Sequence, residues 1–164
     1  MATDSTRRLH HAVPPWVARG AVFHVRLRVD HEWARHHSLV SPRTRAQHLL
    51  ESVRRYHRDG TWHCHLFLLM PDHLHALLSF PDDRPMSRAI AAWKSWHARQ
   101  REVVWQNNYF DHRIRDEREF QLKAAYIRSN PVAKGLCLRP EDWPWVVDGN
   151  SPEAPAGTPA PTSR

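Results

Sequence analysis

Cysteine is scarce in this chain, and long apolar runs are absent. The two cysteines, Cys64 and Cys137, lie far apart, each in apolar surroundings. This pattern is typical of reduced thiols buried in the core of a cytoplasmic protein, and it argues against a disulfide framework. No run approaches the roughly 18 apolar residues that a membrane span needs.

Signals for export or membrane attachment are also missing. Residues 1–19 contain Arg7 and Arg8, but no apolar stretch follows them as it would in a secretory signal. We find neither a basic amphipathic anchor nor a lipidation motif. The sequence therefore predicts a cytoplasmic protein with no membrane partner.

Acidic residues are too few to balance the basic ones. The 164 residues include 24 Lys and Arg against 17 Asp and Glu, a net charge of +7 with histidine neutral. This length fits one domain, and the surplus of positive charge favours a nucleic-acid partner. Eight tryptophans are available either for the core or for stacking on unpaired bases.

Three zones follow one another along the chain, with no internal repeat. Residues 1–18 are polar, basic and broken by prolines, which indicates an arm over the surface. Residues 19–147 hold all the periodic apolar sequence and form the expected domain. Residues 148–164 are rich in proline and contain no large apolar side chain, so we expect a disordered tail.

The middle zone alternates between strand and helix patterns. We expect strands over 21–28, 62–70, 73–80 and 103–110, and helices over 41–58, 87–102 and 116–130. Ser41 is the expected N-cap of the first helix, and Pro131 is expected to end the last one. This order predicts an α+β, ferredoxin-like antiparallel sheet with two helices on one face, followed by a C-terminal helix.

Two histidines lie two residues apart in the third expected strand. Side chains alternate along a strand, so His73 and His75 share a face and point away from the core that Leu74 enters. Two imidazoles at this spacing can hold one divalent ion. A solvated or hydrogen-bonded pair explains the spacing equally well, and a similar pair, His63 and His65, lies on the neighbouring strand.

Three blocks of sequence carry a family resemblance. Residues 70–78 (MPDHLHALL), 105–115 (WQNNYFDHRIR) and 126–136 (YIRSNPVAKGL) resemble, in order, three motifs of the single-tyrosine HUH transposases. Residues 8–11 (RLHH) and 14–17 (PPWV) are similar to the branch called REP-associated tyrosine transposases. The resemblance extends from about residue 7 to about residue 145.

The resemblance implies a reaction and a site. In this family a tyrosine attacks a phosphate of single-stranded DNA, forms a 5′-phosphotyrosine and frees a 3′-hydroxyl, with Mg²⁺ or Mn²⁺ polarising the phosphate. The resemblance assigns the role of nucleophile to Tyr126 and the role of metal ligand to His73, His75 and Asn130. In relatives, a glutamine on the same helical turn takes the place of Asn130. The implied substrates are hairpins of palindromic repeats.

Other residues remain candidates. Tyr109 is the rival nucleophile, whereas Tyr56 has no polar neighbour to activate it. Residues that could contact DNA are Arg7, Arg8, Arg26, Arg28, Lys94, Arg113, Arg115, Arg118 and Lys123. Their combined effect would be binding that weakens steeply with salt.

Three alternative functions stay open at this point. A domesticated, non-catalytic hairpin-binding protein would keep the fold and the ability to bind DNA. A metal-dependent phosphodiesterase would use water and form no covalent intermediate. A histidine-rich metal-binding protein is the third. The sequence also leaves open whether one chain or a homodimer acts.

Overall fold

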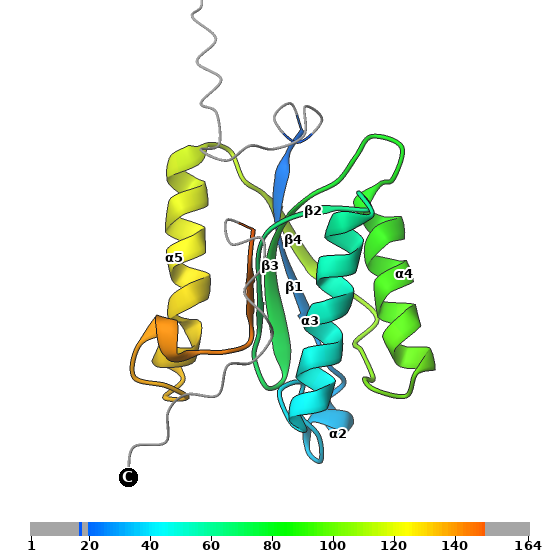
Figure 1. Cartoon of the computed structure of the whole chain (residues 1–164), viewed down its shortest axis with the longest axis vertical. Helices are drawn as coiled ribbons and strands as arrows, with labels where there is room; N and C mark the ends of the chain where they lie inside the picture. The colour runs from blue at the N-terminus through cyan, green and yellow to red at the C-terminus, as the bar shows by residue number, and fades with distance from the viewer. Residues whose placement is uncertain (1–16, 18–19, 150–164) are drawn as a thin grey trace, which may run out of the picture.

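The computed structural model describes residue 17 and residues 20–149 (Figure 1). Apart from Val17, the basic arm with Arg7 and Arg8 lies outside these residues, as does the tail from residue 150. No helix in the described ranges is both long and apolar enough to cross a bilayer. The elements are β1 (Val22–Arg28), α2 (His31–Ala34), α3 (Arg43–Arg58), β2 (His63–Leu69), β3 (His73–Ser79), α4 (Met86–Arg99), β4 (Phe110–Arg113), α5 (Glu117–Ala133), η1 (Pro140–Asp142) and β5 (Val146–Asp148).

The five strands form one antiparallel sheet in the order β4-β1-β3-β2-β5. Without β5 this is the ferredoxin-like order, so the predicted fold class is confirmed. The short β5 was not predicted, because three residues give no periodic signal. It pairs Asp148 with Leu66, so the sheet extends one residue beyond the expected boundary at 147.

Helices cover both faces of the sheet. In Figure 1, α3 and α4 lie against one face and α5 against the other. Leu74, Ala76 and Leu78 of β3 enter the core beneath α3 and α4, as the alternation predicts. Leu77 instead packs with Ile127 of α5 in a second core. The helix α5 therefore covers the face that carries His73 and His75. The two histidines point away from the first core, as predicted, but they are buried under α5 and do not face solvent.

The fourth strand begins later than predicted. Residues 103–109 form no ladder, because Val29 and Trp105 make only an isolated bridge where this segment crosses the end of β1. Val103 and Trp105 still pack on the core, which accounts for the apolar pattern. Pairing with β1 starts at Phe110.

Pro131 does not end α5, contrary to the prediction. The helix continues to Ala133 and ends where Gly135 adopts a positive φ of 70°. The Gly135 N–H donates to the Val132 carbonyl and the Leu136 N–H to the Pro131 carbonyl, the pattern of a Schellman motif. A proline removes one helix hydrogen bond, whereas the left-handed glycine redirects the chain.

Three smaller expectations also change. Pro42, and not Ser41, occupies the N-cap of α3, and no side chain caps that end. The helix α4 ends at Arg99, three residues early, because Arg101 turns the chain with a φ of 58°. Cys64 is buried as expected, but Cys137 is only half-buried, in the loop after α5.

The core beneath α3 and α4 should dominate stability. Leu78→Ala removes a side chain that is 0% exposed, and we expect it to lower the free energy of unfolding by about 2–5 kcal/mol in urea titrations. Leu138→Ala is the matched control, because Leu138 is 90% exposed and should change stability by less than about 0.5 kcal/mol. Equal effects of the two substitutions would contradict this assignment of the core.

Candidate active site

A groove of about 390 Å³ lies between the sheet and the C-terminal half of α5. The ends of β1 and β3 supply its floor, and α5 with the following turn supplies its wall. The lining residues are Arg26, Arg28, Met70, Pro71, Asp72, His73, His75, Tyr126, Asn130, Lys134 and Leu136. The groove therefore gathers the predicted metal ligands and the predicted nucleophile in one place.

The two histidines enter this groove side by side from β3. Their ring centroids lie 5.0 Å apart, and the planes are nearly perpendicular, at 86°. Both side chains are buried, with relative exposures of 7% for His73 and 1% for His75. Burial by α5 fixes rings that would otherwise move freely on an open sheet.

Each histidine is oriented through one ring nitrogen. Nδ1 of His73 lies 2.7 Å from a carboxylate oxygen of Asp72, and Nδ1 of His75 lies 3.0 Å from Nε2 of His24. Hydrogen bonds of this kind fix the ring of a metal-binding histidine and leave its other nitrogen for the ion. In both residues the nitrogen left for a ligand is Nε2.

The environment keeps these imidazoles neutral. Burial, followed by the charges of the neighbouring histidines and arginines, lowers the pKa of His75 to about 3. Burial also lowers the pKa of His24 to about 4, with a further contribution from Lys123. Burial lowers the pKa of His73 despite the opposing effect of Asp72. Neutral imidazoles have the lone pair that a metal ion requires.

Tyr126 and Asn130 approach from α5, one helical turn apart. The Tyr126 ring stands edge-on to the His75 ring, with centroids 5.8 Å apart, and is 53% exposed. Asn130 is buried, and its Nδ2 lies 3.3 Å from Nε2 of His75. An exposed phenol beside a buried histidine is accessible to a large substrate.

These side chains fit a divalent ion. Oδ1 of Asn130 is buried and has no hydrogen-bond partner among the described residues. The O and N atoms of an amide exchange places by a flip of its side chain, which would turn Oδ1 toward Nε2 of His75. Two imidazole nitrogens and an amide oxygen then form a mixed donor set with open positions for phosphate.

Positive charge surrounds the groove. Arg26 lies directly across from His75 in the β1–β3 ladder, and Arg28 lies across from His73. Nζ of Lys123 lies 5.4 Å from the centre of the Tyr126 ring, and Lys134 lines the groove. Three of the predicted DNA contacts, Arg26, Arg28 and Lys123, are therefore at this site.

The other predicted DNA contacts lie elsewhere. Arg113 and Arg115 border a different pocket at the N-terminal end of α5, where Arg115 also pairs with Glu119. Arg118 is exposed on the first turn of the same helix. These three residues could contact DNA only beyond the groove.

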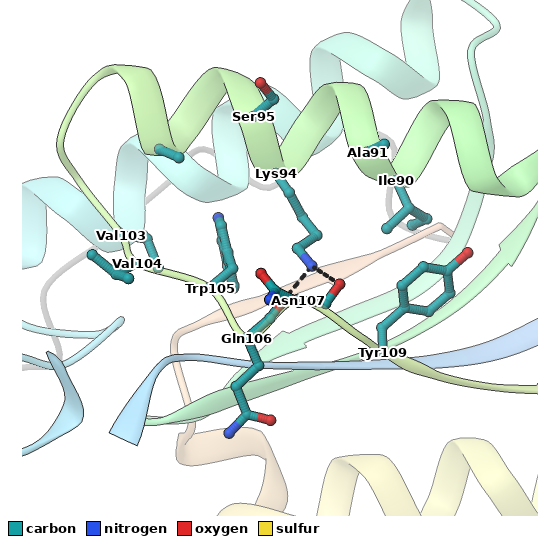
Figure 2. Close-up of a pocket in the computed structure, with 11 residues that line it drawn as sticks. Ile90, Ala91, Lys94, Ser95, Val103, Val104, Trp105, Gln106, Asn107 and Tyr109 are labelled. Atoms are coloured by element: carbon teal, nitrogen blue, oxygen red, sulfur yellow. Dashed lines mark hydrogen bonds between the residues drawn. The ribbon is translucent and has the colours of Figure 1, made fainter. Parts of the chain in front are cut away.

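Lys94 and the rival tyrosine Tyr109 lie on the opposite side of the sheet. Figure 2 shows both in a pocket between α4 and the segment leading to β4, where Nζ of Lys94 donates to the carbonyl oxygens of Gln106 and Asn107. Lys94 thus tethers a loop, and Tyr109 packs against the core on the α3 and α4 side. The Tyr56 ring packs against the Trp62 ring at a tilt of 51°, with 4.8 Å between the ring centres. Of the tyrosines, the groove is lined by Tyr126 alone.

Sequence reasoning missed three residues of the site. His24 follows the alternation of β1, but only the β1–β3 register places it beside His75. Asp72 immediately precedes His73, and Lys134 reaches the groove because α5 continues past Pro131. The second pair, His63 and His65, lies on β2 beside the C-terminal end of β3, away from the groove. There His65 contacts Ser79.

The buried neutral histidines predict acid sensitivity. The folded-state pKa of His24 and His75 is lowered, so between about pH 3 and pH 6.5 the unfolded chain binds more protons than the folded chain. With a chelator present, the free energy of unfolding should be fully retained above pH 6.5 and fall as the pH drops toward 4. Urea titrations at several pH values test this. Stability that rises on acidification over this range would contradict it.

Comparisons with known proteins agree with the sequence resemblance. No family model matches the chain. A protein of Escherichia coli strain K12 named REP-associated tyrosine transposase is 29% identical over 105 residues, which are 62% of this chain and 64% of that protein. A relative from Haemophilus influenzae, provisionally named in the same way, is 31% identical over 94 residues, or 47% of this chain and 53% of its own length. The chain thus matches less than two thirds of either relative.

The fold has a solved counterpart as well. A structure described as a REP-associated tyrosine transposase bound to a REP hairpin superposes with a TM-score of 0.65. The sequences are 24% identical, and the match covers 77% of this chain and 76% of that one. This structural match confirms the fold, and the two curated relatives confirm the similarity to REP-associated tyrosine transposases that three short motifs indicate.

Proposed function

We propose that this relative of the REP-associated tyrosine transposases cleaves and rejoins single-stranded DNA next to hairpins, with Tyr126 as the nucleophile. One observation carries the proposal. Tyr126 and Asn130 of α5 converge with His73 and His75 of β3 on a single groove with a positive rim. Both the resemblance and the named relatives support the same substrate class.

The side chains of the groove have distinct tasks in this reaction. The Tyr126 phenol loses its proton to solvent and its oxygen bonds to phosphorus, while the bond from phosphorus to the 3′-oxygen breaks and that oxygen takes up a proton. This leaves a 5′-phosphotyrosine and a free 3′-hydroxyl, and the exchange of one ester for another makes the step reversible. His73, His75 and Asn130 would hold Mg²⁺ or Mn²⁺, which polarises the phosphate when bound.

The residues around the groove bind and align the strand. Arg26, Arg28 and Lys134 lie where phosphates would pass, so binding should weaken with salt. Phe110 is 44% exposed beside Arg26, whose guanidinium carbon lies 5.1 Å from the ring centre. An exposed aromatic face next to a cation is suited to an unpaired base.

The polarity of the covalent link tests the proposal. The protein is incubated with Mn²⁺ and a single-stranded hairpin taken from beside its own gene, labelled at one end or the other. A 3′ label should move to a protein band that survives denaturation, whereas a 5′ label should appear in a shorter free strand with an extendable 3′-hydroxyl. Cleavage without any adduct would favour a phosphodiesterase that uses water, and binding without cleavage would favour the domesticated hairpin-binding protein.

A further inference from the structure

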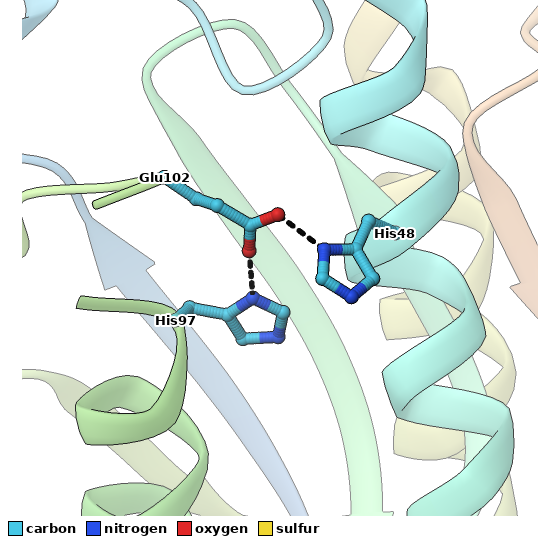
Figure 3. Close-up of side chains that lie close together, drawn as sticks. All are labelled: His48, His97 and Glu102. Atoms are coloured by element: carbon cyan, nitrogen blue, oxygen red, sulfur yellow. Dashed lines mark hydrogen bonds and ion pairs between the residues drawn. The ribbon is translucent and has the colours of Figure 1, made fainter. Parts of the chain in front are cut away.

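A second cluster of possible metal ligands lies on the opposite side of the sheet from the groove. Figure 3 shows Glu102, after α4, between His48 of α3 and His97 of α4. One carboxylate oxygen contacts Nδ1 of His48, and the other lies 2.6 Å from Nδ1 of His97. One ligand atom from each residue lies within 4.8 Å of the other two.

The hydrogen bonds behind His97 favour one tautomer. The Ser52 hydroxyl, on α3, donates to the Leu49 carbonyl at 2.7 Å and accepts from the indole N–H of Trp93 at 2.8 Å. Its remaining lone pair can accept from Nε2–H of His97, also at 2.8 Å. The lone pair on Nδ1 of His97 then faces the carboxylate of Glu102, and two acceptors this close are bridged either by a proton or by a metal ion.

The backbone is shaped to bring Glu102 into this position. The Glu102 N–H donates to the His97 carbonyl, and the Arg101 N–H donates to the Ala98 carbonyl. This is a Schellman motif with Arg101 in the left-handed position, at a φ of 58°. Glycine normally occupies that position, because a Cβ atom is strained in the left-handed conformation. The strained turn directs Glu102 back onto His97.

We propose that His48, His97 and Glu102 bind a zinc ion that ties α3 to the C-terminal end of α4. Two imidazoles and a carboxylate are a common zinc donor set, with solvent as the fourth ligand. His97 is fully buried, whereas the His48 side chain is 45% exposed, so the open position faces solvent. The hydrogen bond from His97 to Ser52 is the outer contact that orients a ligating histidine.

The ion in this cluster differs in kind from the one proposed for the groove. Nitrogen ligands favour zinc over Mg²⁺, which prefers oxygen. A bound zinc would hold the start of the segment 103–109, which carries Trp105 and the carbonyl groups bonded to Lys94. This zinc site is independent of the function proposed for the groove.

A hydrolase triad is the main alternative interpretation of this cluster. Ser52, His97 and Glu102 fall in the order of a serine–histidine–acid relay. However, Ser52 is only 4% exposed, and its oxygen is already held by Trp93 and Leu49. A substrate carbonyl cannot reach it, so the relay is incomplete.

Zinc stoichiometry tests the proposal without any activity assay. The full chain, purified without a polyhistidine tag, is dialysed against ZnCl₂ with excess Mg²⁺, and the bound zinc is counted. His48→Ala should bind one zinc fewer than the wild type. His36→Ala, an exposed histidine on the neighbouring segment, should bind the same number as the wild type. Equal stoichiometry in His48→Ala and wild type would overturn the proposal.

A spectroscopic measurement separates this site from the groove. Co²⁺ in a tetrahedral site absorbs visible light strongly, and this band should survive in His73→Ala but disappear in His48→Ala and in Glu102→Gln. Glu51→Gln is the control, because Glu51 lies on α3, is itself exposed, and pairs with Arg54 and Arg58 rather than with the cluster. A band that persists in His48→Ala, or that disappears only in His73→Ala, would place the ion elsewhere.

Discussion

Tyr126→Phe should abolish the covalent protein–DNA adduct and lower strand cleavage by at least about a thousandfold. The substitution removes only the attacking oxygen. The aromatic ring that packs edge-on against His75 remains, so the groove and the hairpin affinity should be preserved. Denaturing gels with a 3′-labelled hairpin measure the adduct, and filter binding measures the affinity.

Tyr109→Phe is the matched control for this prediction. Tyr109 lies in the pocket beneath α4, on the other side of the sheet from the groove. Burial and the nearby Asp111 raise the pKa of its phenol, so Tyr109 is harder to deprotonate for attack. Tyr109→Phe should form the adduct at the wild-type rate. An adduct that persists in Tyr126→Phe and is lost in Tyr109→Phe would reverse the assignment.

His75→Gln should remove metal-dependent cleavage, by at least about a hundredfold, while hairpin binding changes little. His75 is the most enclosed of the proposed ligands and touches both His24 and Asn130. Glutamine retains hydrogen-bonding capacity in that buried position but lacks the imidazole nitrogen. Mn²⁺ titration of the cleavage rate measures the loss, and His36→Ala provides an exposed histidine control.

Folding must be checked in the same experiment, because His75 is buried. Circular dichroism and urea unfolding of His75→Gln should show a native sheet and a cooperative transition. A chelator added to the wild type should reproduce the loss of cleavage without any substitution. Wild-type cleavage that survives the chelator, or His75→Gln that cleaves normally, would contradict metal use at this site.

Local patterns along a strand and along a helix were enough to pair the predicted residues of the site. The pattern of β3 placed His73 and His75 on one face, and the spacing of Tyr126 and Asn130 placed both on one face of a helix. The sequence could not show that α5 covers that face, because this depends on how the chain returns after β4. For the same reason the histidines were expected to point outward, whereas they are buried.

The remaining differences come from contacts that the pattern of a single strand or helix does not specify. His24 meets His75 through a register that no local pattern specifies. The Nζ of Lys94, a predicted DNA contact, donates to the carbonyl oxygens of Gln106 and Asn107 in the loop before β4, and its contact with DNA stays a prediction. Pro131 was expected to end α5, but the end depends on the left-handed conformation of Gly135, and this adds Lys134 to the groove. Burial and register thus refined a site whose residue types were already visible.

Mapping the modified residue tests the central claim most directly. The trapped adduct would be digested with nuclease and protease, and the peptides analysed by mass spectrometry. We predict a nucleotide attached through its 5′-phosphate to the peptide that contains Tyr126. A nucleotide on Tyr109 or Tyr56, or on a residue other than tyrosine, would contradict the account of this groove as the cleavage site.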